Sequence, residues 1–269
     1  MNHIQLSILA EEAQQEQLIS ILSILGATGF EQTETTLLAY FEEEAFPSYE
    51  VNEILKDYAF QIHTVQEQNW NAVWESNFQP VVVGDFCAVR ADFHAPIPQV
   101  EHEIIITPKM SFGTGHHATT HMMMEQMQQI DFQGMEVFDF GTGTGILAIL
   151  AEKLGAAQIT AIDNDEWSFE NARENTAKNN CTKIAVQLSS VLPENRQYDI
   201  VLANINRNVI LQYLPYLKNL VKKEGLVLLS GLLKEDKEAI SAACNQVGFD
   251  GQTEKERNNW ISLLFVNRN

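Results

Sequence analysis

The sequence is poor in cysteine and in basic residues, and it has no long apolar run. Its three cysteines, Cys87, Cys181 and Cys244, lie far apart, which excludes a disulfide framework or a cysteine zinc cage and fits a reducing compartment. The apolar run Ile146–Ala151, among the longest, is far shorter than the roughly 18 residues of a membrane helix. The first ten residues contain no Lys or Arg, unlike a signal peptide. We therefore expect a cytoplasmic protein with no membrane association.

The charge is strongly and unevenly negative. There are 17 Lys and Arg residues against 36 Asp and Glu residues, which gives a formal net charge of −19. Such a chain repels a nucleic-acid backbone, so we expect no direct nucleic-acid binding, whereas a basic partner is attracted. Residues 1–67 hold twelve of the acids and one base, Lys56. This shift in composition predicts a domain boundary near residue 67.

The first 66 residues predict a small α+β domain. The alternation of apolar residues and the positions of the glycines give the order βαββαβ, which is the ferredoxin-like arrangement. The expected strands are His3–Leu9, Phe30–Thr35, Leu37–Phe41 and Phe60–Val65, and the expected helices are Glu12–Leu25 and Tyr49–Tyr58.

A linker helix is expected over residues 67–79, because Trp70, Trp74 and Phe78 recur at a spacing of four. From Glu136 onward, strands and helices alternate, as in a doubly wound parallel sheet. The strands Phe249–Glu256 and Trp260–Val266 flank Arg257-Asn258-Asn259, a hairpin signal that predicts an antiparallel last strand. The expected helices include one near Val209–Lys222. We assign residues 80–269 to this α/β domain.

The strongest functional signal is a glycine-rich turn between a buried strand and a helix. The sequence V-F-D-F-G-T-G-T-G places Gly141, Gly143 and Gly145 where the backbone can turn tightly and approach a ligand. The next strand ends at Asp163, whose carboxylate can accept hydrogen bonds from ribose hydroxyls. The pattern predicts a nucleoside cofactor.

The spacing of the glycines favours S-adenosylmethionine over NAD. A dinucleotide fingerprint, G-x-G-x-x-G, needs its third glycine where this chain has Ile146. Asp139, two residues before the loop, suits a cationic group better than a pyrophosphate. S-adenosylmethionine has no phosphate and carries an ammonium and a sulfonium.

A second glycine-rich stretch leads into a helix that contains His117 and His121. Their spacing of four is that of a zinc helix, but Ala118 stands where the zincin pattern has Glu, and no third ligand follows at a readable spacing. We therefore expect no metal, and interpret these residues as the polar start of a helix over the cofactor.

Asn204 is the candidate catalytic residue. It ends the fourth predicted strand, and strand ends face the ligand crevice in open α/β sheets. Its side-chain carbonyl can accept a hydrogen bond from an amine and so aim the nitrogen lone pair at a methyl group. A helix N-cap is the alternative role for Asn204, and loop polarity the alternative for Asn206 and Asn208.

Several of these stretches resemble bacterial methyltransferases of ribosomal protein L11. The similar segments, over about residues 60–267, are F-G-T-G-H-H-A-T-T ending at Thr120, the glycine loop from Asp139, Ile162-Asp163, Ala203-Asn204-Ile205, L-S-G-L-L from Leu229, and the tryptophans of the linker. The first is specific, whereas the glycine loop is shared by most class I methyltransferases.

The resemblance implies a cytoplasmic enzyme that methylates lysine side chains and the terminal amine of L11, a basic protein. It implies cofactor contacts at Thr120, Gly141, Asp163 and Asn204. Asn206-Arg207 follows the A-N-I motif in a region that varies in the family. Lysine, with a pKa of about 10.4, must lose its proton, and the sequence offers no general base.

Alternative functions stay open at this stage. A methyltransferase of another protein amine or amide, such as a release-factor glutamine, is disfavoured because N-P-P-Y is absent at the strand end. An NAD oxidoreductase is disfavoured by the third glycine. A binding module without catalysis is disfavoured by the presence of Asp139, Gly141, Asp163 and Asn204.

Overall fold

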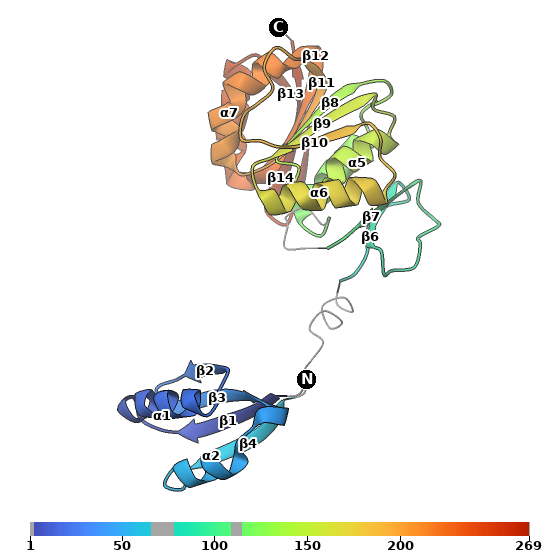
Figure 1. Ribbon diagram of the computed structural model, residues 1–269. Helices are drawn as coiled ribbons and strands as arrows, with labels where there is room; N and C mark the ends of the chain where they lie inside the picture. Colours follow the sequence, from blue (N-terminus) through green and yellow to red (C-terminus); the bar gives the residue numbers. More distant parts are fainter. Residues whose placement is uncertain (1–2, 66–77, 109–114, 269) are drawn as a thin grey trace. The chain divides into compact units, whose positions relative to one another are not determined.

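The computed structural model describes residues 3–65, 78–108 and 115–268 and divides into two compact units, Met1–Asn77 and Phe78–Asn269. Figure 1 shows the helices and strands of each unit. The predicted helix over 67–79, with Trp70 and Trp74, lies outside the described residues except for its last two positions.

The first unit has the predicted βαββαβ order. Its strands are β1 (His3–Leu9), β2 (Gly29–Gln32), β3 (Thr36–Glu42) and β4 (Phe60–Val65), and its α-helices are α1 (Glu12–Ile24) and α2 (Ser48–Ile54). The sheet order is β2-β3-β1-β4, and each neighbouring pair is antiparallel. Alternate residues of β1 are buried, so one face of the sheet packs against the helices around Leu6, Ile8 and Leu22. This is the ferredoxin-like topology.

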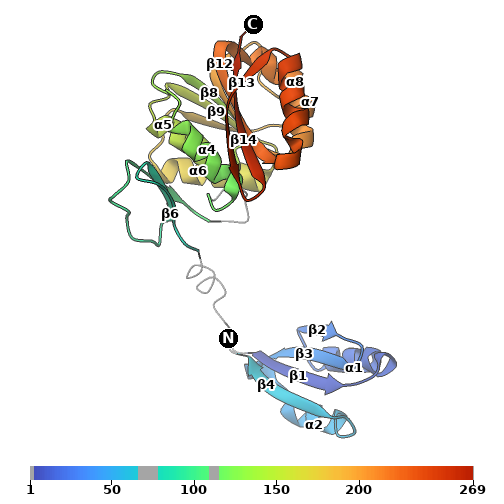
Figure 2. The ribbon, with the colours of Figure 1, turned by 180° about the vertical axis from the view of Figure 1, so that it is seen from behind.

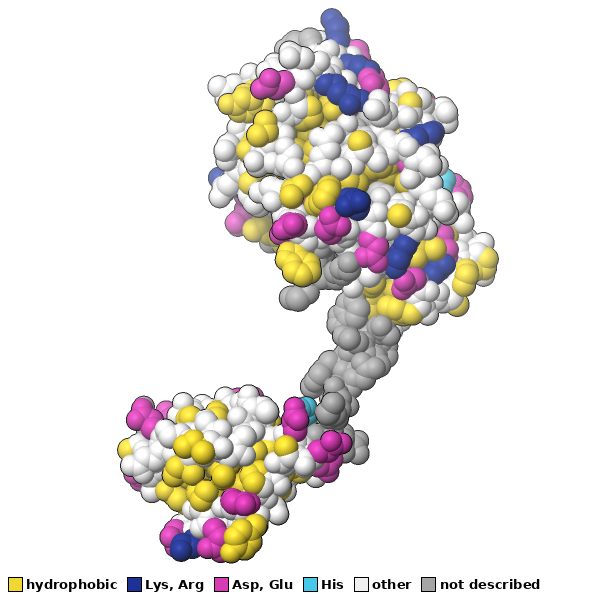
Figure 3. Space-filling view, viewed as in Figure 1, with side chains coloured by type: hydrophobic (Ala, Val, Ile, Leu, Met, Phe, Trp, Pro, Cys, Tyr) yellow, Lys and Arg dark blue, Asp and Glu magenta, His cyan; other side chains and the backbone are white. Residues whose placement is uncertain are grey.

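Acidic side chains lie on the surface of the first unit. Figure 3 shows them scattered over the visible face rather than gathered in one patch. Glu42, the last residue of β3, and Glu43 and Glu44 after it form an exposed run. The negative charge of this unit is therefore available to an approaching basic partner.

The second unit begins with a small sheet. Strands β5 (Val81–Val83) and β6 (Cys87–Ala91) form an antiparallel hairpin, and β7 (His102–Ile106) lies parallel to β6. Every residue of β6 is buried, and Val89 and Ile104 belong to a core shared with helices of the larger sheet. The small sheet is thus part of the second unit.

The larger sheet has seven strands in the order β10-β9-β8-β11-β12-β14-β13. They are β8 (Glu136–Phe140), β9 (Gln158–Asp163), β10 (Ile184–Leu188), β11 (Tyr198–Asn204), β12 (Val221–Leu233), β13 (Phe249–Arg257) and β14 (Trp260–Asn267). Strand β14 runs antiparallel to both β12 and β13, whereas the pairs from β10 to β12 are parallel. The predicted antiparallel last strand is confirmed.

Helices cover both faces of this sheet (Figures 1 and 2). Helices α4 (Ala118–Met127), α5 (Ile146–Lys153) and α6 (Glu166–Lys178) lie on one face, and α7 (Arg207–Leu220) and α8 (Lys237–Gln246) lie on the other. Successive residues of β8 point to opposite faces, so Val137 packs in the core with α5 and Phe138 in the core with α7. The fold is the class I methyltransferase sheet that the sequence predicted.

Several predicted boundaries differ: the strand expected over Phe30–Thr35 is β2, Gly29–Gln32, and the helix expected over Tyr49–Tyr58 is α2, which ends at Ile54. The helix expected near Val209–Lys222 ends at Leu220, and β12 begins at once, because buried Val221 pairs with Tyr198 of β11. Glu224 then takes a positive φ of 62°, which lets the strand resume its pairing at Leu226. No helix in the described residues is long and apolar enough to cross a bilayer.

The order of the strands locates the candidate site. From β8 the chain moves outward to β9 and β10 and then returns to β11, on the other side of β8. This reversal is the topological switch point, at which the loops beyond the carboxyl ends of the strands separate and leave a crevice.

Candidate active site

A cavity of about 650 Å³ lies along the carboxyl edge of the larger sheet. Its wall is formed by residues that end or follow neighbouring strands, with contributions from the start of α4, from α6 and α7, and from the first residue of β14. The lining includes four residues predicted from the sequence, namely Gly141, Gly143, Asp163 and Asn204. The structure therefore brings these residues together, as expected from parallel strands that end at one edge.

The glycine loop after β8 takes backbone conformations that suit glycine. Gly141 has φ of +72° and Gly143 has φ of +56°. A Cβ atom at Gly141 would overlap the side chain of Ile205, so the neighbouring loop also requires the absence of a side chain there. The loop can thus present its backbone to a ligand.

Asp163, at the end of β9, is tied to this loop. Its Oδ2 accepts a hydrogen bond from the Gly143 N–H at 2.9 Å, and its Oδ1 accepts one from the Asp165 N–H at 3.1 Å. A carboxylate has about four lone-pair sites, so two backbone bonds leave capacity for hydroxyl donors. The carboxylate is half-buried and forms part of the cavity wall.

Asp139 lies beneath the loop and does not line the cavity. Its side chain is buried, and its Oδ2 accepts a hydrogen bond of 2.5 Å from Thr142 Oγ1. Burial disfavours the charged carboxylate and raises the pKa of Asp139 to about 7. A positive charge nearby would favour ionisation, so this carboxylate suits a cationic ligand in the adjacent cavity.

Asn204, at the end of β11, is held from behind by Thr120. The Asn204 Nδ2 donates a hydrogen bond of 3.0 Å to Thr120 Oγ1, and the Thr120 side chain is buried on α4. The Oδ1 atom of Asn204 is also buried, yet it has no hydrogen-bond partner among the described residues. A buried acceptor without a partner costs stability, which indicates that a ligand donor belongs there.

The cofactor contact expected at Thr120 stays a prediction. Thr120 is absent from the cavity wall and contacts Asn204. The N-cap of α7 is Asn206 and not Asn204, the residue for which this role was the alternative. The Asn206 Oδ1 accepts a hydrogen bond of 3.1 Å from the Val209 N–H at the start of α7. Asn204 is thus not needed as a cap.

The two histidines of the second glycine-rich stretch play different parts. His117 is the N-cap of α4 and lines the cavity, with its Nδ1 2.7 Å from Thr119 Oγ1. Burial lowers the pKa of His117, and it also lowers the pKa of His121, one turn further along. No group of three His, Cys, Asp or Glu side chains suited to a metal occurs within the described residues.

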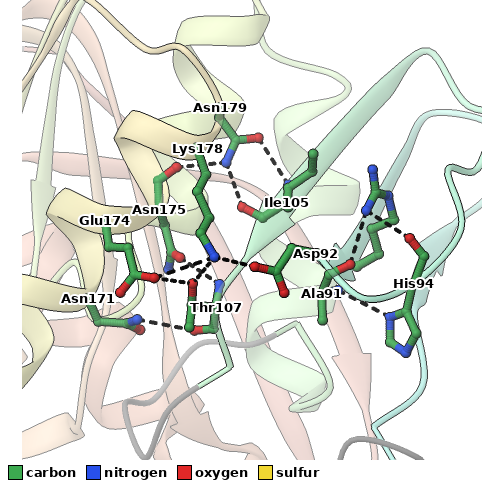
Figure 4. A network of polar contacts seen from close by, with 11 residues as sticks. Ala91, Asp92, His94, Ile105, Thr107, Asn171, Glu174, Asn175, Lys178 and Asn179 are labelled. Atoms are coloured by element: carbon green, nitrogen blue, oxygen red, sulfur yellow. Dashed lines mark hydrogen bonds and ion pairs between the residues drawn. The ribbon is translucent and has the colours of Figure 1, made fainter.

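Asparagines on α6 position the strand that precedes this stretch (Figure 4). Asn179 brackets Ile105 of β7, accepting from its N–H at 3.0 Å and donating to its carbonyl at 2.6 Å. One turn earlier, Asn175 accepts from the Thr107 N–H at 2.8 Å. The edge of β7 that faces away from β6 therefore bonds to side chains instead of another strand.

The same helix also reaches the cofactor loop. Asn175 Nδ2 donates a bond of 2.8 Å to the Thr144 carbonyl, and Asn171 Nδ2 donates one of 3.1 Å to the Thr107 carbonyl. Both asparagines are fully buried. Lys178 pairs with Asp92 across the same junction (Figure 4). Helix α6 therefore holds both the glycine loop and Thr107, which follows β7.

Sequence reasoning missed several parts of the wall. Ser189 and Ser190 follow β10, and their position after the end of a parallel strand could have indicated that they line the cavity. Gly231, with φ of +82°, lies against the Ile205 backbone, where a Cβ would overlap the Ile205 carbonyl. The glycine in the L-S-G-L-L segment could have indicated this close approach. The predicted antiparallel strand that begins at Trp260 was a signal for Trp260, whereas Tyr213 had no local signal, because its place depends on helix packing.

Comparisons with known proteins agree with this architecture. The PrmA family, described as ribosomal protein L11 methyltransferase, matches residues 9–268. A ribosomal protein L11 methyltransferase of Porphyromonas gingivalis is 38% identical over 268 residues, covering 96% of this chain and 92% of that protein. One from Chlorobaculum tepidum is 35% identical, covering 100% of this chain and 98% of that protein.

Solved structures give the same result for the fold. The crystal structure of ribosomal protein L11 methylase from Lactobacillus delbrueckii subsp. bulgaricus has a TM-score of 0.66 and 28% identity, and the match covers 71% of this chain and 100% of that one. A Pyrococcus furiosus methyltransferase, 19% identical with a TM-score of 0.52 over 62% of this chain and 90% of that one, shares the fold. The chain belongs to the ribosomal protein L11 methyltransferase family.

Proposed function

We propose that this protein transfers methyl groups from S-adenosylmethionine to amino groups of ribosomal protein L11, on lysine side chains and the terminal amine. The observation that carries the proposal is the Oδ1 atom of Asn204, a buried acceptor for which the described part of the chain provides no donor. It lies in the wall of a cavity beside a glycine loop. Relatives named for this reaction support the same substrate.

The residues of the cavity fit S-adenosylmethionine. A volume of about 650 Å³ is within the range of small-molecule sites. Asp163 would accept hydrogen bonds from ribose hydroxyls, and Gly141 and Gly143 would let the ligand approach the backbone. Buried Asp139 would be ionised by the cationic groups of the cofactor. We expect no metal in this site.

The chemistry requires a neutral amine in a fixed orientation. When bound, S-adenosylmethionine supplies an electrophilic methyl carbon, whose bond to sulfur breaks, leaving the electron pair on sulfur, as the nitrogen lone pair bonds to carbon. Asn204 Oδ1 accepts an N–H of the amine and so directs its lone pair. Loss of water contacts when the amine enters the cavity favours its neutral form, and the proton leaves to water.

The acidic first unit is assigned to substrate recognition. In this proposal, residues 1–66 capture the basic L11 protein, residues 67–79 form a linker helix, and residues 80–269 carry out methyl transfer. Twelve acids and one base in residues 1–67 support the assignment, because they raise the local concentration of a basic substrate. We place the reaction in the cytoplasm, without direct nucleic-acid binding or membrane association.

Charge variants of the full-length chain test substrate capture. Changing Glu42, Glu43 and Glu44 together to Gln should raise the KM for L11 several-fold, because the attraction is weakened, and leave S-adenosylmethionine affinity unchanged. High salt should reduce the difference from wild type, since exposed charges are screened beyond about 8–10 Å. The matched control changes three exposed acids of the second unit, Glu194, Glu235 and Glu238, to Gln. Equal KM changes in both variants would remove the role of the first unit.

The reaction itself is tested by mass spectrometry of ribosomal proteins after incubation with methyl-labelled cofactor. We expect label on L11 amino groups. Label on another protein amine or amide would replace L11 as the substrate. Cofactor binding in calorimetry without any methyl transfer would instead indicate a binding module without catalysis.

A further inference from the structure

Trp260 reaches the cavity because of the direction of its strand. It is the first residue of β14, and it pairs with Leu233 near the end of β12. Since β14 runs antiparallel to β12, its beginning lies at the edge where the parallel strands end. Asn258 and Asn259 have φ of 51° and 65°, as in the tight type I′ turns that suit hairpins, so the turn fixes where Trp260 starts.

The order of the strands gives the order of residues along the cavity wall. Asp163 is on β9, Asn204 on β11 and Trp260 on β14, in the sheet order β9-β8-β11-β12-β14. Trp260 is therefore beyond Asn204, on the side away from the carboxylate assigned to the ribose. Two strand spacings, about 10 Å, separate the backbones of β11 and β14, and an indole can extend across most of that gap.

The indole is held by a neutral neighbour. The Trp260 and His117 rings meet edge to face, with centroids 4.7 Å apart and an interplanar angle of 71°. Both rings line the cavity with Asn204, and Trp260 is half-buried. Burial lowers the pKa of His117, so its ring adds no positive charge that would repel a cationic substrate.

We propose that Trp260 is the residue that holds the substrate nitrogen as a cation between methyl transfers, so that successive methyl groups are added to one nitrogen. The inference rests on the proposed function. Each methylation replaces an N–H by a methyl group, so Asn204 Oδ1 loses donors as the reaction advances. Between transfers the aromatic face of Trp260 attracts the ammonium whatever its number of methyl groups, because this attraction needs charge and not N–H groups; the ammonium loses its proton to water before the next transfer.

The structure offers a matched pair of tryptophans for the test. Trp260→Leu removes the aromatic face in the cavity, and Trp260→Phe retains a weaker one. Trp167→Leu is the control, because Trp167 is 79% exposed on α6 and is not part of the cavity wall. The assays are S-adenosylmethionine affinity by calorimetry and the proportions of mono-, di- and trimethylated L11 by mass spectrometry at limited turnover.

We expect Trp260→Leu to bind S-adenosylmethionine as wild type does but to release partly methylated L11. A cation–aromatic contact corresponds to roughly a five- to thirty-fold change in retention. A peptide that contains trimethyllysine should inhibit wild type more strongly than the same peptide in which a carbon atom replaces the charged nitrogen. This preference for the charged peptide should disappear in Trp260→Leu. Trp260→Phe should be intermediate, and Trp167→Leu should match wild type.

Three outcomes would overturn the inference. In the first, wild type adds only one methyl group to each nitrogen. In the second, Trp260→Leu gives the same methylation pattern as wild type. In the third, the charged and uncharged peptides inhibit wild type equally. In each case methyl transfer to L11 would still support the proposed function. If wild type binds S-adenosylmethionine but does not methylate L11, the proposed function itself fails.

Discussion

Replacing Thr120 by valine removes the hydroxyl that holds the Asn204 amide while nearly preserving the shape of the side chain. Thr120 Oγ1 accepts the Asn204 Nδ2 bond at 3.0 Å, and the Thr120 side chain is buried. The variant leaves a buried amide donor without its partner, which costs about 1–3 kcal/mol. If the transition state loses the same amount of stabilisation because Asn204 is no longer held in its orientation, kcat falls about five- to 150-fold.

The assay compares kcat with the dissociation constant of S-adenosylmethionine. We expect a large loss in kcat and a small change in affinity, because Thr120 supports Asn204 and does not line the cavity. Thr120→Ser, which keeps the hydroxyl, should retain most of the activity. In the double variant with Asn204→Ala, the Thr120→Val change should add little further loss.

Two results would refute this reasoning. Wild-type kcat in Thr120→Val would show that the hydrogen bond does not position Asn204. A loss of affinity as large as the loss of kcat would make Thr120 a direct cofactor contact. A thermal unfolding curve of each variant separates these results from a loss of folded protein.

Three further substitutions test the rest of the site. Asp163→Ala should weaken S-adenosylmethionine binding at least tenfold by calorimetry, because charge-assisted bonds to hydroxyls contribute about 1.5–3 kcal/mol each; unchanged affinity would contradict the assignment. Gly141→Ala should lower both thermal stability and cofactor affinity, since the added methyl overlaps Ile205 and the φ of +72° disfavours alanine; a variant with wild-type values for both would exclude the close approach. Burial raises the pKa of Asp139 to about 7, so its stabilising contribution is present below pH 4 and is lost as pH rises through 7. Asp139→Asn should therefore lose less stability than wild type between pH 5 and 8.5 without cofactor, by a few kcal/mol, and parallel unfolding curves would contradict this.

Most of the fold could be predicted because the apolar patterns are strictly local. The strand His3–Leu9 has the predicted bounds, because apolar and polar residues alternate along it, and β9 ends at Asp163 as predicted. The end of α7 could not be predicted, because the pairing of Val221 with Tyr198 across the sheet overrides the helical pattern.

Some residues of the candidate site could likewise be predicted from the sequence, and others could not. The positions of Asp163 and Asn204 at strand ends follow from sequence, because parallel strands must end at one edge. Trp260 was missed although the predicted antiparallel strand begins there, because its place opposite Asn204 also depends on the order of strands in the sheet. The hydrogen bonds of Asn175 to β7 and to the glycine loop join segments distant in sequence and leave no local pattern.

Methyl transfer to L11 by wild type and by Asn204→Ala is the most direct measurement of the central claim. Purified full-length protein is incubated with L11 and methyl-labelled S-adenosylmethionine, and labelled residues are identified by mass spectrometry while cofactor affinity is measured by calorimetry. We predict label on amino groups of L11 with wild type, and a loss of turnover much larger than the loss of affinity with Asn204→Ala. Equal methylation of L11 by both proteins, or no label on L11 with wild type that binds the cofactor, would contradict the account.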